Sequence, residues 1–301
     1  MTIARTHLVL VVPGWKLSPL HAQAREHLMV QCLQRGVDLS IMPEFASGID
    51  LARNITVAKF LEIQDATVLG MIDGDIAFNP ENVFEILDAI EQGLDVVGVL
   101  YPKKVVDYKA VARASQQGVP DEELKFHAGQ FVGGGAPGSR RSWQSASGKR
   151  FVDADKLGTG FLFMARSAIE KFIAFHKKRI EHHSHWEPKG LQHLVFFSEL
   201  QGPRQQAKDA LLDLAQRMAK GMASTDEVLD AAHQFAIAQE GPLDQYQTED
   251  FNFIYRAKEA GIACWMYLDA QTAHQGTWIF EGNIASVLDA AKKKEDEPVA
   301  V

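Results

Sequence analysis

Short apolar runs alternate with longer amphipathic segments along the first third of the chain. The apolar runs have the length and β-branched content of buried strands, which are expected at 8–12, 37–42, 67–72 and 95–100. The segments between them have helical spacing, and helices are expected at 18–36, 50–63 and 79–91. Ser18 and Asn79 each precede a proline, the order of an N-cap followed by the first helical residue. This alternation predicts an α/β layer structure.

The pattern changes in the second half of the chain. Residues 102–152 are polar and rich in glycine, and an irregular segment of this length is usually functional or mobile. A strand at 161–165, a helix capped by Ser167 and a mostly helical insert at about 180–245 are expected next. A helix capped by Thr248, a strand at 262–268 and a helix from Asn283 complete the pattern. The predicted organisation is one domain over 1–290, followed by a disordered charged tail at 291–301.

Composition narrows the class of protein without identifying it. A hydrophobic content of 46% with 23% charged residues is typical of a globular protein. The net charge of -8 argues against non-specific nucleic-acid binding by the chain as a whole, because such binding relies on excess Lys and Arg. Two cysteines do not make a disulfide framework, so we expect the cytoplasm of a bacterium or of a virus-infected host cell. No apolar run approaches the roughly 20 residues of a membrane helix, so no membrane insertion is expected.

Two aspartates stand where a strongly apolar strand is expected to end. Asp73 and Asp75 follow the run 67–72 and are separated by Gly74, which leaves room for a ligand to approach the backbone. Residues i and i+2 of an extended chain face the same side, and strand carboxyl ends are where open α/β sheets bind ligands. Two close carboxylates repel each other unless a cation is near, and Mg²⁺ or Mn²⁺ suits their oxygens. The alternative is a turn that caps the helix beginning at Pro80.

Several blocks in a fixed order give this pair a context. The blocks are Leu51-Ala-Arg-Asn54, Asp65 to Pro80, Val96 to Pro102, Gly158 to Arg166, Thr248 to Arg256 and His274-Gln-Gly276. No block is specific alone, but the ordered set resembles the GT-A glycosyltransferases over most of 5–105 and 155–285. The resemblance implies a Rossmann-like GT-A fold, with a mixed, mainly parallel sheet flanked by helices and a helical insert. It also implies metal-dependent transfer of a hexose or pentose from a nucleoside-diphosphate sugar, a UDP-sugar by default, to an acceptor hydroxyl.

The resemblance also implies roles for particular side chains. Asp73, Asp75 and His274 would hold the metal, and an imidazole beside carboxylates suits Mn²⁺ better than Mg²⁺. Asp250 would be the general base, with Glu249 as its substitute, unless both acids only stabilise the start of a helix. The implied donor-binding residues are Pro13, Gly14, Arg53, Asn54, Gly74, Thr159, Gly160 and Gly276. The alternatives are a surface loop histidine, a surface ion pair at Arg53, and packing turns at the glycines.

The segment 102–152 is locally basic, with nine Lys or Arg against four acidic residues. Lys104, Arg140 and Arg141 are its candidates for contact with phosphate on the acceptor or on the donor. The acceptor classes left open are a glycan, a lipid-linked sugar, a protein, a small molecule and DNA with hydroxymethylated bases. Two other functions remain alternatives: a metal-dependent nucleotidyltransferase, and a non-catalytic nucleic-acid or polymer-binding protein on the same fold.

Overall fold

A computed structural model describes most of the chain and divides it into two compact units. The described residues are 6–13, 16–44, 48–134, 141–177, 179–182, 190–193, 195–276 and 279–289. One unit combines Met1–Phe196 with Phe253–Val301, and the other is Phe197–Asn252. The predicted disordered tail, 291–301, lies outside the described residues.

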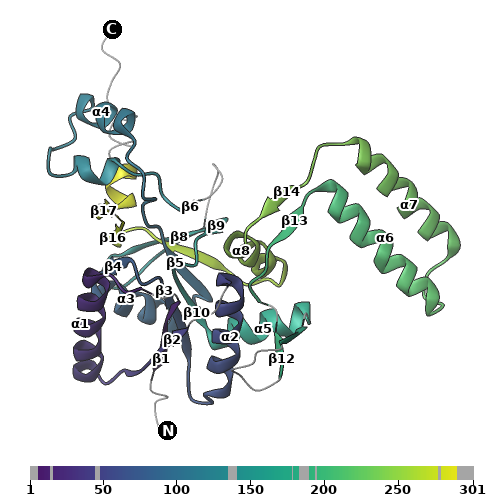
Figure 1. The fold of residues 1–301 in the computed structure, drawn as a ribbon, viewed down its shortest axis with the longest axis horizontal. Coiled ribbons are helices and arrows are strands. Elements are labelled where there is room, and N and C mark those ends of the chain that lie inside the picture. Colours follow the sequence, from purple (N-terminus) through teal and green to yellow (C-terminus); the bar gives the residue numbers. More distant parts are fainter. Residues whose placement is uncertain are drawn as a thin grey trace. The chain divides into compact units, whose positions relative to one another are not determined.

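The first unit is built on an eight-stranded sheet in the order β2-β1-β3-β10-β5-β15-β8-β7 (Figure 1). Its strands are β1 (His7–Pro13), β2 (Asp38–Glu44), β3 (Val68–Ile72), β5 (Val96–Val99), β7 (Ser142–Gln144), β8 (Arg150–Asp153), β10 (Phe161–Ala165) and β15 (Cys264–Tyr267). Strands β10 and β8 run opposite to the other six, because β10 pairs antiparallel with β3 and β5, and β8 with β15 and β7. The sheet is therefore mixed, with most strands in one direction, as the resemblance implies.

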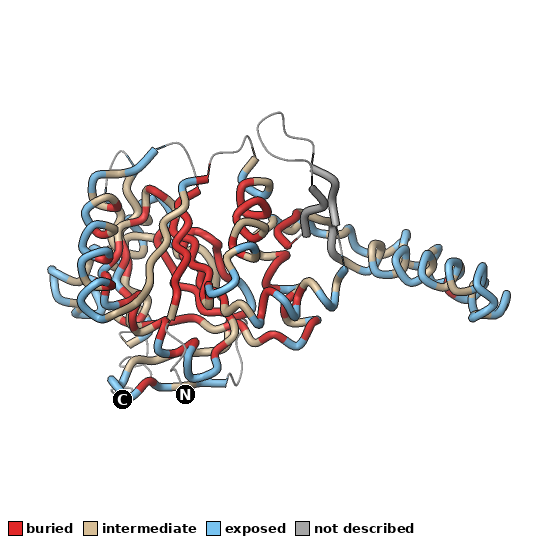
Figure 2. The backbone as a smooth tube through the Cα atoms, turned by 90° about the horizontal axis from the view of Figure 1, so that it is seen from below, coloured by how far each residue is buried: buried red, intermediate tan, exposed pale blue. Residues whose placement is uncertain are grey.

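Both faces of this sheet are covered by apolar side chains. Along β1, Val9 and Val11 belong to one buried cluster, whereas Leu8 and Leu10 belong to the other. Alternate residues of a strand face opposite sides, so a continuous apolar run such as β1 indicates a strand buried on both faces. Figure 2 shows the central strands as the largest buried part of the molecule.

Apart from one at 108–116, which was not expected from the sequence, the helices of this unit begin and end close to the predicted positions. They are α1 (Pro19–Arg35), α2 (Ile49–Glu62), α3 (Pro80–Glu91), α4 (Tyr108–Gln116), α5 (Arg166–His176), α8 (Glu249–Glu259, which begins in the second unit) and a helix over 284–289. Ser18 caps α1 and Asn79 caps α3, as predicted, and Gly36 ends α1 with a left-handed φ of 71°. The predicted cap Ser167 is wrong, because α5 begins one residue earlier with Ala165 at its N-cap. None of the helices in the described ranges has the length and apolar content to span a bilayer.

Within the glycine-rich segment 102–152, the described residues 102–134 and 141–152 contain more regular structure than the composition predicts. They include α4, the 3-10 helix η1 (Leu124–His127), β6 (Gly133–Gly134), β7 and the start of β8. Strand β6 pairs with β9 (Lys156–Leu157), and Trp143 of β7 packs edge-on against Phe151 with ring centroids 5.0 Å apart. The strands β6, β7 and β8 have only two to four residues, which is too short for an alternating pattern to mark them in the sequence.

A second, smaller sheet follows the main one, in the order β17-β16-β4. Its strands are β4 (Ile76–Phe78), β16 (Thr272–Gln275) and β17 (Ile279–Gly282). Both partners of β16 are antiparallel to it, and the register places His274 opposite Ile76. This pairing brings a strand from the end of the chain beside the residues that directly follow Asp75.

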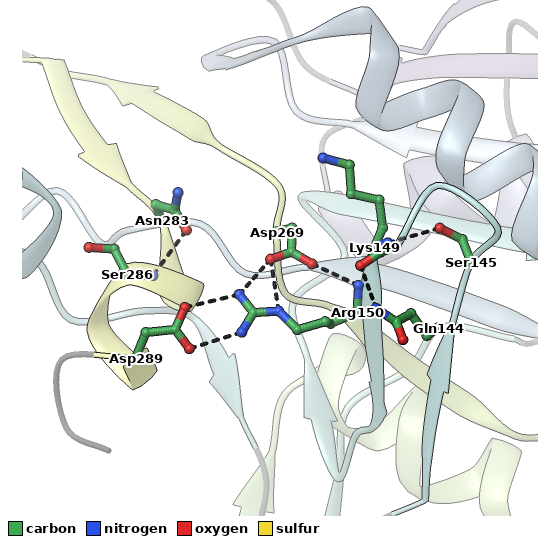
Figure 3. A network of polar contacts seen from close by, with 9 residues as sticks. Gln144, Ser145, Lys149, Arg150, Asp269, Asn283, Ser286 and Asp289 are labelled. Carbon is green, nitrogen blue, oxygen red and sulfur yellow. Dashed lines mark hydrogen bonds and ion pairs between the residues drawn. The ribbon is translucent and has the colours of Figure 1, made fainter. Parts of the chain in front are cut away.

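The polar network around Arg150 fixes the last described helix to the main sheet (Figure 3). The guanidinium donates to Asp269 Oδ1 through Nε at 2.9 Å, and to Asp289 Oδ1 through Nη1 at 2.9 Å. Asn283 accepts from the amide of Ser286 at 3.3 Å, so it caps this helix as predicted. Arg150 therefore links the helix over 284–289, through Asp289, to Asp269, which lies two residues after the end of β15.

The predicted insert at 180–245 is only partly helical. Residues 179–193 include β11 (Arg179–His182) and β12 (Gly190–His193), which is a correction to the helical expectation. The second unit contains α6 (Pro203–Ala219) and α7 (Thr225–Glu240), with β13 (Glu199–Gln201) paired to β14 (Gln245–Gln247) at their base. Ser224 begins α7 with a capping box to Glu227.

Candidate functional site at the carboxylate turn

The turn Asp73-Gly74-Asp75 connects β3 to β4, where a buried strand reaches its carboxyl end. Three backbone hydrogen bonds fix it: Asp73 N–H to Gly160 O at 2.9 Å, Ile76 N–H to Asp73 O at 2.9 Å, and Ser18 N–H to Gly74 O at 2.7 Å. The turn is thus held by β10 on one side and by the start of α1 on the other. The prediction that both aspartates lie at a strand end is confirmed.

Gly74 does not have the role that the sequence suggested. A Cβ atom at this position would lie 2.5 Å from the carbonyl oxygen of Lys16 and 3.1 Å from Leu17 Cδ2. The space beside Gly74 is therefore filled by the segment before α1 and is not open to a ligand. Glycine is required here because backbone packs directly against backbone.

Asp75 lies between two cationic or potentially cationic groups. Lys104 Nζ contacts its Oδ2 atom, and His274 Nε2 lies 3.2 Å from its Oδ1 atom. Burial raises the pKa of Asp75, but the hydrogen bonds from His274 and Lys104 outweigh that effect and lower the pKa to about 2. The carboxylate is therefore ionised at every pH at which the protein is expected to work.

His274 is oriented by a second hydrogen bond. Its Nδ1 atom lies 2.9 Å from the carbonyl oxygen of Pro102, which can only accept, so Nδ1 carries the proton. The ring also packs edge-on against Tyr101, with centroids 5.5 Å apart, and the side chain is 14% exposed. Nε2 is thereby directed at Asp75. Metal-binding histidines commonly have this arrangement, in which the other ring nitrogen donates to a backbone carbonyl.

Asp73 lies in a different environment from Asp75. Its Oδ1 atom is buried and accepts no hydrogen bond from the described residues, and its nearest recorded cation is Arg53, with Nη2 at 3.8 Å. Burial raises the pKa of Asp73, and the nearby guanidinium of Arg53 opposes that shift. Arg53, on α2, is itself almost fully buried, with 6% of its side chain exposed. The predicted neighbours Arg53 and Asp73 are therefore close together, but too far apart for a hydrogen bond.

Gly160 packs against Asp73, and Thr159 precedes it in the chain. A Cβ atom on Gly160 would lie 2.8 Å from Asp73 Oδ2 and 2.6 Å from the hydroxyl of Tyr101. The Gly160 amide donates to that hydroxyl at 3.2 Å. Thr159 is buried, and its Oγ1 atom has no hydrogen-bond partner among the described residues. Unpartnered buried oxygens on Thr159 and Asp73 are uncommon in a finished core and are typical of a site that a polar ligand completes.

The predicted metal ligands fit a divalent cation only in part. Among the described residues, no three His, Cys, Asp or Glu side chains converge closely enough to enclose a metal ion. Asp75 and His274 are in contact, whereas Asp73 points to Arg53, so the expected ready-made three-ligand site is not present. Mg²⁺ and similar ions are often bound by one or two protein ligands together with substrate phosphates. Asp75 and His274 fit a site of that kind.

Asn54 is structural, contrary to the predicted contact with the donor. Its amide donates to the carbonyls of Asp50 at 2.9 Å and Phe196 at 2.6 Å, and its carbonyl accepts from the amides of Val195 and Phe196 at 2.8 and 3.0 Å. These four bonds use the full capacity of the side chain. Asn54 therefore fastens residues 195–196 to α2 and has no polar atom left for a ligand.

The predicted base lies in the second unit. Asp250 Oδ1 accepts from the amide of Phe251 at 2.8 Å and from the hydroxyl of Thr248, both at the start of α8. Glu249 is the first residue of the same helix. These contacts match the alternative in which the acids stabilise a helix start. The role of Asp250 as a base stays a prediction.

Several basic residues of 102–152 are paired within the protein. Lys104 contacts Asp75, Lys125 lies 2.6 Å from Glu281, and Arg141 lies 3.1 Å from Asp153. Arg141 also lies over the ring of Trp265, but 64% of its side chain is exposed, so its contact with phosphate stays a prediction. Arg140 and the donor-site candidate Gly14 lie outside the described residues.

Two predicted donor residues lie at the edge of this site. Pro13 is the last residue of β1 and pairs in register with Glu44 of β2. Gly276 follows β16, and a Cβ atom there would lie 3.2 Å from Lys104 Cδ. Gly276 therefore lies against the stem of the lysine that contacts Asp75.

Sequence reasoning missed three residues that position the site. Tyr101 supports both Gly160 and His274, and Ser18 holds the Gly74 carbonyl. His21 is fully buried on α1, and its Nδ1 atom donates to Ile76 O at 2.9 Å; burial lowers the pKa of this imidazole. A polar residue in the first turn of an otherwise apolar helix face was the available indication for His21.

One cavity beside these strands is separate from the carboxylate site. A cavity of about 680 Å³ is lined by Ala77, Ala273 and Glu281, which are register partners in the small sheet. His274 is the next residue along β16 and so faces the opposite side of that sheet. The cavity therefore does not include Asp73, Asp75 or His274.

Comparisons with known proteins find similarity only at the level of solved structures. The sequence matches no protein-family model. It matches no curated protein sequence either. A structure of a protein from STIV is similar over 90% of this chain and 86% of its own, at 13% identity and a TM-score of 0.43.

Two further solved structures are named as transferases. The match to a putative glucose-1-phosphate thymidylyltransferase from Bacillus anthracis covers 98% of this chain and 98% of that protein, at 9% identity and a TM-score of 0.38. A glycosyltransferase involved in glycosylation of the major capsid of PBCV-1 covers 55% of this chain and 62% of its own, at 11% identity and a TM-score of 0.29. At this level of similarity the matches say nothing about function. Any functional proposal must therefore rest on the geometry of the carboxylate turn.

Proposed function

We propose that this chain is a metal-dependent glycosyltransferase that uses a nucleoside-diphosphate sugar, with a UDP-sugar as the first donor to test. The observation that carries the proposal is the pairing of Asp75 with His274. The carboxylate is ionised, and the imidazole presents Nε2 to it because Nδ1 is bonded to Pro102 O. An oxygen and a nitrogen ligand held together at the end of a central strand suit Mn²⁺ or Mg²⁺.

The residues of the turn have separate roles in this proposal. Asp75 and His274 would hold the cation, which would stabilise the charge that develops on the departing diphosphate. Arg53 is buried 3.8 Å from Asp73 and keeps a positive charge beside the buried carboxylate. The unpartnered oxygens of Asp73 and Thr159 would accept hydrogen bonds from hydroxyls of the donor.

The ammonium of Lys104 and the imidazole of His274 contact different oxygens of Asp75. Lys104 contacts Oδ2, whereas His274 lies beside Oδ1. In the proposed mechanism Lys104 would leave Asp75 if a cation bound there and would then contact the diphosphate, because an ammonium and a divalent ion repel each other. The flexible stem of lysine, which lies against Gly276, allows such a movement.

The acceptor is proposed only as a class, a molecule with a free hydroxyl. A glycan, a small molecule and DNA with hydroxymethylated bases all satisfy that requirement. Asp250 remains the proposed base, with Glu249 as its substitute. Hydrogen-bond reach to the acceptor hydroxyl is the geometric condition that either acid must meet.

Calorimetry with a panel of nucleoside diphosphates, with and without Mn²⁺, tests the proposal. UDP or another member should bind only when Mn²⁺ is present, and Asp75→Ala should abolish this binding. Asp121→Ala, at an exposed position, is the matched control and should bind as the wild type does. Absence of Mn²⁺-dependent binding of any nucleoside diphosphate to the wild type would refute the proposal.

Product analysis separates the glycosyltransferase from a nucleotidyltransferase. With a nucleotide sugar and Mn²⁺, a glycosyltransferase releases the nucleoside diphosphate, by transfer or by slow hydrolysis. In a second mixture, of a sugar 1-phosphate and a nucleoside triphosphate with the cation, a nucleotidyltransferase transfers the nucleoside monophosphate to the sugar phosphate and releases pyrophosphate. Pyrophosphate release without any nucleoside-diphosphate release would replace the proposed activity by the second one.

A further inference from the structure

The helical hairpin of the second unit, α6 and α7, lacks a core of its own. Both helices are described over their full length, and Ala231 is their one buried residue. Leu212 is 50% exposed, Leu229 62% and Ile237 52%. Figure 2 shows the pair almost entirely as exposed or intermediate. Two amphipathic helices cannot bury their apolar side chains against each other alone, so the hairpin lacks the packing that stabilises helical units.

One face of the hairpin carries an apolar set, in which Ala232 is half-buried and the other members are exposed. In α6 its members are Leu212, Ala215 and Ala219, and in α7 they are Leu229, Ala232 and Ala236. Each set has the spacing i, i+3, i+7, which keeps its members on one side of a helix.

The two sets also share a face of the hairpin. Successive residues of a helix are about 100° apart around its axis. Viewed along each helix from its N-terminus, the apolar set is rotated in the same direction away from the residues that face the neighbouring helix. The residues that face the neighbouring helix include Leu211 in α6 and Ala231 in α7. The two helices run antiparallel (Figure 1). The same rotation therefore brings both sets to one face. The opposite face carries Asp226, Asp230 and Ile237.

We propose that this apolar face is a dimerisation surface, and that its occupant is the same face of a second copy of the chain. Two hairpins stacked in this way form a four-helix bundle, the arrangement in which short amphipathic helices bury a common core. A 17-residue helix is about 25 Å long and two helices are about 20 Å wide, so the pair buries about 1,000 Å² in total. That area is the size at which specific interfaces begin.

Charge selects one arrangement of the two copies. Helix α6 carries three cationic and two acidic residues, whereas α7 carries four acidic residues and neither Lys nor Arg. A two-fold axis parallel to the helices places α6 of one copy on α7 of the other, and all neighbouring helices are then antiparallel. The alternative two-fold axis places α7 on α7 and brings the acidic helices together.

Lys208 and Glu240 are the charged residues at the end of the apolar face that would favour the pairing of α6 with α7. Lys208 lies one turn before Leu212 on the same side of α6, and Glu240 lies one turn after Ala236 on the same side of α7. In the favoured arrangement Lys208 of one copy lies near the end of the apolar set on α7 of the other. Opposite charges at the rim of an interface favour one pairing over the other.

Sedimentation velocity and light scattering of the full chain test the surface. The wild type should be a dimer, and the double variant Leu212→Glu/Leu229→Glu should be a monomer with unchanged helix content by circular dichroism. Ile237→Glu is the matched control, because Ile237 has a similar exposed fraction but lies on the opposite face, and it should remain a dimer. A monomeric wild type, or a double variant that still dimerises, would overturn the proposal.

A charge exchange tests the arrangement. Lys208→Glu should raise the dimer dissociation constant about fivefold, because two symmetric contacts become repulsive. Glu240→Lys should do the same, and the double exchange Lys208→Glu/Glu240→Lys should restore the wild-type value. Additive weakening in the double exchange would exclude α6 on α7 as the pairing.

Discussion

Lys104 and Asp75 form an ion pair that joins the residues after β5 to the turn after β3. They are 29 residues apart in the sequence, and the pair places a protein ammonium on Oδ2 of the carboxylate, whereas His274 contacts Oδ1. Any divalent ion that binds Asp75 must compete with that charge. The Lys104 ammonium therefore competes with the cation for Asp75, and the strength of the ion pair contributes to the metal affinity.

Replacing Lys104 by methionine should strengthen binding of Mn²⁺ in the absence of nucleotide. Loss of the competing ammonium should lower the Mn²⁺ dissociation constant by about tenfold, equivalent to about 1.4 kcal/mol. Electron paramagnetic resonance measures the concentration of free Mn²⁺ and so gives this dissociation constant directly. Lys103→Met is the neighbouring control and should leave the constant unchanged. Weaker Mn²⁺ binding in Lys104→Met would contradict the competition.

The low pKa of Asp75, about 2, predicts a specific dependence of stability on pH. A carboxyl group whose pKa is lower in the folded than in the unfolded state stabilises the fold above its unfolded value, near pH 4, and loses this effect as pH falls through 2. Asp75→Asn lacks the effect. The difference in free energy of unfolding between wild type and Asp75→Asn should therefore shrink from pH 5 towards pH 2.5.

The expected change is about 1 kcal/mol, because the side chain is 40% exposed and solvent screens the charges. Urea unfolding at several pH values measures it. Asp121→Asn should show a difference that does not vary with pH. A constant difference for Asp75→Asn as well would mean that Lys104 and His274 do not stabilise the ionised carboxylate.

The strands and capped helices of the first unit follow from local sequence. Helix α3 has the predicted bounds because Asn79-Pro80 fixes its start, and β10 because its apolar run is continuous. The positions of Asp73 and Asp75 follow in the same way from the end of β3. These features depend on neighbours in the sequence, so periodicity and capping rules detect them.

The partners of those residues depend on contacts that sequence spacing does not encode. Asn54 resembles a donor-site residue in its sequence block, yet its side chain is used by residues 195–196, more than 140 positions away. Lys104 was expected to meet phosphate, and it meets Asp75. A polar side chain shows its chemistry in the sequence, but only the folded arrangement decides which partner satisfies it.

Replacing Asn54 by alanine should destabilise the first unit strongly. Four hydrogen bonds are lost, and the amides of Val195 and Phe196 become buried donors without partners. The free energy of unfolding should fall by about 2–4 kcal/mol. Asn82→Ala is the control: Asn82 is also buried but has one recorded side-chain bond, of 3.3 Å, and should cost about 1 kcal/mol. Equal costs for the two variants would show that the Asn54 bonds do not fasten residues 195–196.

Replacing Gly160 by alanine should disturb Asp73 without unfolding the protein. The new methyl group would lie 2.6 Å from Tyr101 Oη and 2.8 Å from Asp73 Oδ2, so one of these groups must move. Overpacking of this kind costs about 1–3 kcal/mol, and Mn²⁺-dependent binding of a nucleoside diphosphate should weaken by at least about tenfold. Gly276→Ala is the matched control, because its methyl group would meet only the flexible stem of Lys104 and a ring edge of Phe280, at 3.2 Å or more. Its stability should change by less than about 0.5 kcal/mol. If Gly160→Ala binds the nucleotide as well as Gly276→Ala does, the position of Asp73 is not important for the donor, and Asp75 with His274 alone would define the site.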